Sequence, residues 1–153
     1  MNHITIAPAR VYDVPGIRML LIALYRELGF RPGSRSVDPA DITARVLDPE
    51  RSMLVACYNE QPIGLLCFTH PDWQRADHDC AIDELYVLPS FRQLAVAELL
   101  LRKGIELAHR QGWNSLSTGL NDRCTSAICR TAAFAPSSLH IKSTVATTGL
   151  LFH

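Results

Sequence analysis

The stretch that ends at Ala97 joins a strand-like run to the start of a long helix, with an arginine at the junction. The apolar run Leu85-Tyr86-Val87 leads through a short proline-containing turn into residues 92–97, which begin with Arg92. The first N–H groups of a helix have no partner within it, and the helix dipole favours anions at that end. Arg92 would add a charge-assisted contact to a phosphate. The pattern therefore predicts a phosphate-binding loop, with a plain strand–turn–helix that binds no ligand as the alternative.

This stretch resembles the acyl-CoA pyrophosphate loop of the GNAT N-acetyltransferases, which reads Arg/Gln-x-x-Gly-x-Gly/Ala after a strand ending in Val-x-Pro. Here Arg92 opens the pattern, Ala97 closes it and Ala95 replaces the central glycine. We expect a helical backbone at Ala95 to tolerate the extra methyl group, so that binding is weakened rather than lost. The resemblance implies acetyl-CoA as co-substrate. The implied pyrophosphate contacts are Arg92, Gln93, Leu94, Ala95, Val96 and Ala97.

The resemblance also implies roles for the preceding strand. The backbone of Leu85, Tyr86 and Val87 would pair with the pantetheine arm as an added strand does. An amine must lose its proton to attack a thioester, so a nearby base helps. Asp83 is the first candidate for a base or amine-orienting group, and Glu84 is the second because strand alternation directs it to the other face. That alternation places Ala81, Asp83, Leu85 and Val87 on one face and Ile82, Glu84 and Tyr86 on the other. The alternative for Asp83 is a strand-end carboxylate in solvent or in a salt bridge.

A weaker similarity lies further along the chain, where the family often reads Asn-x-x-Ala-x-x-x-Tyr-x-x-x-Gly-Phe. Phe134 matches the final phenylalanine, which places Cys129 at the tyrosine that protonates the departing CoA thiolate in many relatives. A thiol with a pKa of about 8.5 is acidic enough to donate that proton. The alternative is a buried cysteine in the core face of a helix.

Hydrophobic periodicity and turn residues predict the elements that position these groups. The predicted strands cover residues 4–7, 53–58, 63–68, 81–87, 115–120 and 138–146, and the predicted helices cover residues 13–28, 38–46, 95–112 and 122–133. The order β-α-α-β-β-β-α-β-α-β predicts an α/β fold with a mixed sheet flanked by helices. It is also the order of the GNAT fold. We expect a single domain over residues 1–153.

The charge balance and the residue composition exclude several classes of binding partner. Fifteen basic and fifteen acidic residues balance, so no overall field attracts nucleic acid or an anionic membrane. The apolar runs are too short to span a bilayer. Five cysteines form no C-x-x-C pair, and the six histidines show no metal-ligand spacing. We therefore expect a cytoplasmic protein with reduced thiols, no metal, and no nucleic-acid or membrane partner.

The function that these observations favour is transfer of an acetyl group from acetyl-CoA to a primary amine of a small molecule, peptide or protein, in a ternary complex. A non-catalytic acyl-CoA-binding or interaction domain on the same scaffold is the alternative. A nucleotide- or nucleic-acid-binding module is disfavoured by the neutral charge. The sequence does not indicate which amine is the acceptor, and it leaves open whether the chain forms a homodimer.

Overall fold

A computed structural model describes residues 3–71, 79–113 and 115–117 of the chain. Its strands are β1 (Ile4–Pro8), β2 (Arg51–Tyr58), β3 (Gln61–Thr69), β4 (Asp79–Val87) and β5 (Ser115–Ser117). Its α-helices are α1 (Val14–Glu27), α2 (Pro39–Leu47) and α3 (Val96–Arg110), and two 3₁₀ segments are η1 (Val11–Asp13) and η2 (Pro89–Leu94).

The five strands form one mixed sheet in the order β1-β2-β3-β4-β5. The first four strands are antiparallel neighbours, and β5 runs parallel to β4. The two-residue turn Asn59-Glu60 joins β2 to β3, and both of its residues have positive φ, as a tight hairpin with right-handed twist requires. The described pairing between β4 and β5 extends from Asp79 to Ala81.

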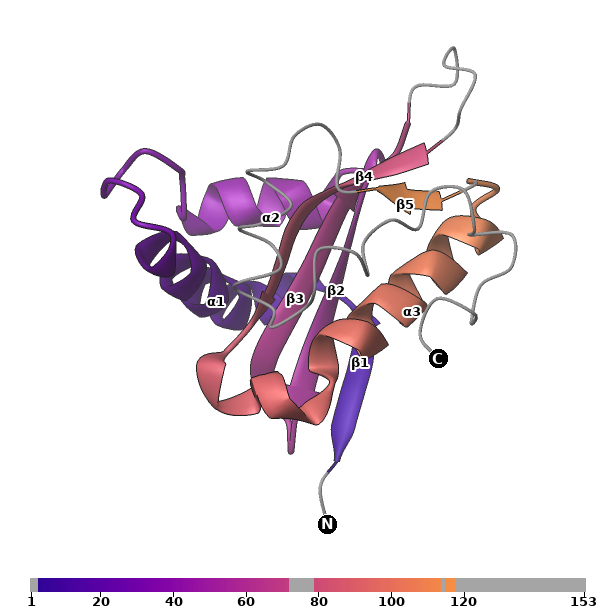
Figure 1. Cartoon of the computed structure of the whole chain (residues 1–153). Helices are drawn as coiled ribbons and strands as arrows, with labels where there is room; N and C mark the ends of the chain where they lie inside the picture. The colour runs from indigo at the N-terminus through magenta and orange to yellow at the C-terminus, as the bar shows by residue number, and fades with distance from the viewer. Residues whose placement is uncertain (1–2, 72–78, 114, 118–153) are drawn as a thin grey trace.

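Helices α1 and α2 cover one face of the sheet and α3 covers the other (Figure 1). Helix α3 packs closely on its face, because a Cβ atom at Gly104 would lie 2.6 Å from Leu66 Cδ2. Successive side chains of β2 and β3 point alternately into the two cores, as the two-residue period of a strand predicts. Leu54 and Leu66 thus belong to the core under α3, and Val55 and Leu65 to the core under α1 and α2.

The helix starts follow from local chemistry. Asp38 caps α2, since its Oδ1 accepts a hydrogen bond of 2.8 Å from the N–H of Ala40, with Pro39 in the first turn. Helix α1 begins differently. Asp13 does occupy the N-cap position, but its Oδ2 accepts from the N–H of Arg10 at 2.8 Å. Its carboxylate therefore closes the η1 turn before the helix.

The predicted α/β fold with a mixed sheet is confirmed, and the predicted element order holds from the first strand through the fifth. The helix predicted at residues 122–133 and the strand predicted at residues 138–146 lie outside the described residues. Within the part of the chain that the structure describes, no helix combines the length and the apolar character needed to cross a membrane.

Candidate active site

Strand β4 carries a β-bulge at its two carboxylates. In the pairing with β3, Glu84 lies opposite Cys67 and Ile82 lies opposite Phe68, so Asp83 is the extra residue. A bulge resets the alternation of side chains along a strand. Ile82 consequently packs in the same core as Leu85. Our expectation from strict alternation, which placed Ile82 on the face opposite Leu85, is wrong because the bulge lies between these two residues.

Glu84 is a buried carboxylate that links three elements. It is 9% exposed, its Oε1 forms an ion pair with Nη2 of Arg45 from α2, and its Oε2 accepts a 2.9 Å hydrogen bond from the hydroxyl of Tyr25 in α1. Burial and the charge of Glu84 raise the pKa of Tyr25 to about 12. Burial alone would lower the pKa of Arg45, but the nearby carboxylate more than offsets this and raises it. Both partners of Glu84 thus keep their protons, and each carboxylate oxygen of Glu84 has a partner.

Asp83 differs from its neighbour in every respect that matters for a base. Its side chain is exposed, and its Oδ2 accepts a 2.6 Å hydrogen bond from the hydroxyl of Thr69 on β3. Partial desolvation raises the pKa of Asp83, although the Thr69 hydrogen bond opposes that shift. An accessible carboxylate with a raised pKa is better suited to take a proton than a carboxylate that is tied to an arginine.

The loop after β4 reaches α3 through a left-handed residue. Ala95 has φ 57° and ψ 29°, and it stands at the N-cap position of α3 without a side-chain cap hydrogen bond. The expectation that Ala95 adopts helical angles is wrong, because α3 begins at Val96. The left-handed region is the one that glycine occupies at little cost. The loop therefore keeps a glycine-like conformation with an alanine, and no N-cap side chain covers the first N–H groups of the helix.

The predicted pyrophosphate residues divide into two groups in the structure. Gln93, Leu94 and Ala95 are exposed, so their side chains and backbone are accessible. Val96 and Ala97 are buried in the first turn of α3, so only their backbone N–H groups can meet a ligand. The same holds for the predicted pantetheine residues, because the side chains of Leu85, Tyr86 and Val87 are all buried.

Arg92 forms a set of contacts that connects this loop to α1. Its Nη2 donates to both carboxylate oxygens of Glu27, at 2.8 and 2.9 Å, and its Nε donates to the carbonyl oxygen of Val87 at 2.9 Å. Its guanidinium also lies 5.6 Å from the centroid of the Tyr86 ring. Glu27 was not predictable as a partner of Arg92, because it lies 65 positions away and looks like an ordinary polar residue at the end of a helix.

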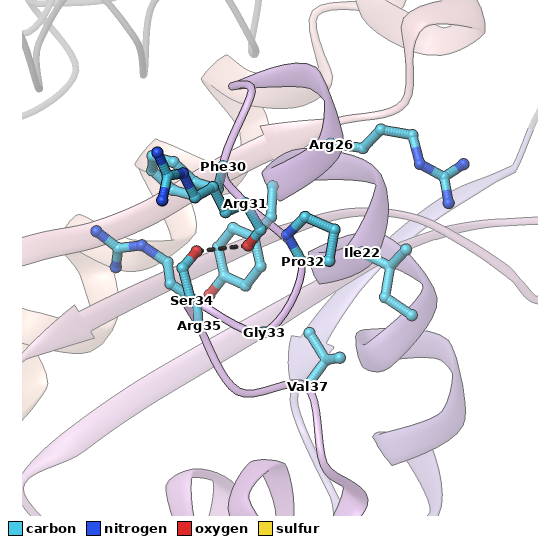
Figure 2. Close-up of a pocket in the computed structure, with 10 residues that line it drawn as sticks. Ile22, Arg26, Phe30, Arg31, Pro32, Gly33, Ser34, Arg35 and Val37 are labelled. Carbon is cyan, nitrogen blue, oxygen red and sulfur yellow. Dashed lines mark hydrogen bonds between the residues drawn. The ribbon is translucent and has the colours of Figure 1, made fainter.

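A pocket of about 270 Å³ opens between α1 and the loop that follows it (Figure 2). Its described lining consists of Ile22, Tyr25, Arg26, Phe30, Arg31, Pro32, Gly33, Ser34, Arg35 and Val37. Tyr25 belongs both to this lining and to the Glu84 cluster. Sequence reasoning missed the pocket, although the connecting loop after α1 carries Phe30 next to Arg31 and close to Arg35.

Cys129 lies outside the described residues, and so its predicted role stays a prediction. Among the residues that the structure describes, no group of three or more histidine, cysteine or carboxylate side chains could hold a metal ion. Cys57 and Cys67 are free cysteines.

Comparison with family models gives a match that covers most of the chain. The model described as the acetyltransferase (GNAT) family matches residues 20–123, a span that includes α2, all of β2 to β4, and α3. A comparison with curated protein sequences finds no match.

Solved structures show the same fold at low sequence identity. The ribosomal-protein-alanine N-acetyltransferase from Brucella melitensis biovar Abortus superposes with a TM-score of 0.61 at 19% identity, over 74% of this chain and 77% of that chain. The aminoglycoside 6'-N-acetyltransferase AAC(6')-Ih from Acinetobacter baumannii gives 0.65 at 16%, over 87% and 91%. AAC(6')-Iy in complex with a CoA bisubstrate analogue gives 0.66 at 18%, over 87% and 91%.

Proposed function

Because this chain belongs to the GNAT acetyltransferase family, we propose that it transfers the acetyl group of acetyl-CoA to a primary amine of a small molecule or peptide. The observation that carries the proposal is the path from β4 through η2 to α3. It combines exposed loop residues, a left-handed Ala95 and a helix start without a side-chain cap, within the span that the family model matches. Such a helix start is suited to a pyrophosphate.

The proposed reaction is a direct transfer. The amine nitrogen attacks the thioester carbonyl carbon, the carbon–sulfur bond breaks, and CoA leaves as a thiolate. Asp83 takes the proton that the amine must lose, either directly or through water, because it is the accessible carboxylate of the pair. Glu84 serves as a positioning residue that ties α1 and α2 to β4 at the bulge. The thiol of Cys129 is the proposed proton donor to the departing thiolate.

For CoA itself, we propose contacts of two kinds. The backbone of residues 93–97 would hold the pyrophosphate, and the backbone of Leu85 to Val87 would pair with the pantetheine arm, since those three side chains are buried. Arg92 would either contact a phosphate directly or hold the loop in shape through Glu27. Glycine in place of Ala95 would let the loop backbone approach the phosphate more closely.

The experiment that tests the proposed function measures release of the CoA thiol from acetyl-CoA in the presence of a panel of primary amines. Turnover that depends on the amine supports the acetyltransferase. Binding of CoA by calorimetry without turnover of any amine would instead favour the non-catalytic acyl-CoA-binding domain. No binding of CoA would contradict both functions.

A further inference from the structure

The described lining of the pocket beside α1 contains basic side chains and no acidic ones. Three of its ten described lining residues are arginines, Arg26, Arg31 and Arg35, and none of the ten carries a carboxylate. In Figure 2 the side chains of Arg31 and Arg35 lie together near Phe30, and Arg26 extends away from them on the other side. The lining thus has arginine side chains and an aromatic ring at one end of a small cavity.

Among the residues that the structure describes, no ion pair joins Arg26, Arg31 or Arg35 to a carboxylate. Glu27 is bound to Arg92, Asp41 accepts a hydrogen bond from Ser36, and Asp38 caps α2. The guanidinium of Arg35 lies instead over aromatic rings, 4.6 Å from the centroid of Phe30 and 5.8 Å from that of Tyr25. A guanidinium that stacks on a ring keeps its N–H groups at the edge, where they can donate to an anion.

The pocket is also connected to the carboxylates of β4. The ring of Tyr25 lines the pocket, and its hydroxyl donates to Glu84, the residue next to Asp83. An acceptor that extends from the pocket past Tyr25 would therefore bring its far end toward the bulge of β4. A volume of about 270 Å³ suits a small molecule, since it falls near the lower limit of typical ligand pockets.

We propose that the amine acceptor carries an anionic group, a carboxylate or phosphate, on an apolar or aromatic body, and that this pocket selects it. The proposal rests on the acetyltransferase function. The anion would accept hydrogen bonds from Arg31 and Arg35, the body would pack against Phe30 and Tyr25, and the amine would lie toward Asp83. The same arginines repel a polycationic amine, so charge excludes that class of acceptor.

The test compares two amines that differ only in charge, 4-(aminomethyl)benzoate and 4-(aminomethyl)benzamide. Calorimetry measures the binding of each to the CoA-bound wild-type protein, and thiol release measures kcat/KM for each. We expect the carboxylate to bind roughly tenfold more tightly or better, which is the effect of a charge-assisted hydrogen bond of about 1.5 kcal/mol. Equal binding of the two amines would overturn the proposal.

Substitutions of single arginines test whether Arg35 causes the preference for the carboxylate. Arg35→Ala should remove most of the preference, and Arg35→Glu should reverse it in favour of the amide and of a diamine. Arg110→Ala removes an exposed arginine from the last turn of α3 and should keep the wild-type preference. A preference that Arg35→Ala and Arg35→Glu leave unchanged would place the anion site elsewhere and overturn the proposal.

The two proposals fail separately. If amines are turned over without any preference for a negative charge, the acetyltransferase stands and the anionic acceptor is excluded. If the carboxylate binds with an Arg35-dependent preference but no amine is turned over, the pocket assignment stands and the proposed acetyltransferase activity is excluded.

Discussion

The hydroxyl of Tyr25 donates a 2.9 Å hydrogen bond to Oε2 of Glu84, although 59 positions separate the two residues in the chain. The bond ties α1 to β4 at the bulge that exposes Asp83. Because the ring of Tyr25 also lines the pocket, this one side chain joins the proposed acceptor pocket to the proposed base. The other oxygen of Glu84 is held by Arg45, so both oxygens of this buried carboxylate have a partner.

Removal of Arg45, the positive partner of Glu84, should therefore lower the stability of the protein. Arg45→Met leaves a 9% exposed carboxylate without its cation, and we expect the free energy of unfolding to fall by about 3 kcal/mol. Urea denaturation measures this loss. Lys103→Met is the matched control, since Lys103 forms a mostly exposed pair with Glu106 and should change stability by less than about 0.5 kcal/mol. Similar losses in the two variants would show that the Arg45–Glu84 pair contributes little.

Because Ala95 has a left-handed conformation, glycine at this position should stabilise the protein. An L-residue in this region costs roughly 1–2 kcal/mol, and glycine escapes that cost but loses about 0.5–1 kcal/mol through chain entropy. We expect Ala95→Gly to raise the free energy of unfolding by about 0.5–1 kcal/mol and to tighten CoA binding. Ala97→Gly, inside the first turn of α3, should instead lower stability by about 1 kcal/mol. Equal destabilisation by both substitutions would mean that Ala95 is helical in solution.

Arg92 and Glu27 allow a test of how the loop binds CoA. Arg92→Ala should weaken CoA binding by about 1.5–3 kcal/mol if the guanidinium contacts a phosphate. Glu27→Gln removes the carboxylate that holds Arg92 in the structure, and we expect this variant to bind CoA at least as tightly as the wild type. Calorimetry measures both. If Glu27→Gln loses as much affinity as Arg92→Ala, Arg92 acts by holding the loop to α1 rather than by direct contact.

The raised pKa of Asp83 predicts how the rate depends on pH. A general base acts when it is deprotonated, so kcat/KM should rise with pH through the pKa of Asp83 and then level off. Asp83→Asn should lower kcat/KM roughly tenfold or more, remove that rise and leave CoA affinity nearly intact. Glu106→Gln, an exposed carboxamide substitution on α3, is the control and should behave as the wild type. An unchanged profile in Asp83→Asn would transfer the role of base to Glu84.

The element order was predictable because its signals are local. The spacing of Ile17, Leu20, Leu21 and Leu24 identifies the buried face of α1, and all four are buried in the structure. The alternation of β2 and β3 likewise follows from a period of two. The bulge at Asp83 was not predictable, because it depends on how β4 pairs with β3 and leaves no mark in the order of residue types.

The candidate site was predictable only where it lies along one stretch of chain. The loop from Arg92 to Ala97 and the carboxylate at Asp83 belong to that stretch. The partners Glu27 and Arg45 come from α1 and α2, and only the packing of those helices on the sheet brings them to Arg92 and Glu84. The conformation of Ala95 was missed for a related reason, since its residue type favours a helix and the turn that precedes it imposes positive φ.

The most direct test of the central claim is the fate of the acetyl group. Wild-type protein is incubated with a primary amine and acetyl-CoA that carries a deuterated acetyl group, and mass spectrometry follows the label. The acetyltransferase predicts that the label appears on the amine nitrogen, in proportion to the free CoA released, and that Asp83→Asn slows its appearance. A label that remains on CoA, or that appears only as free acetate, would contradict the account.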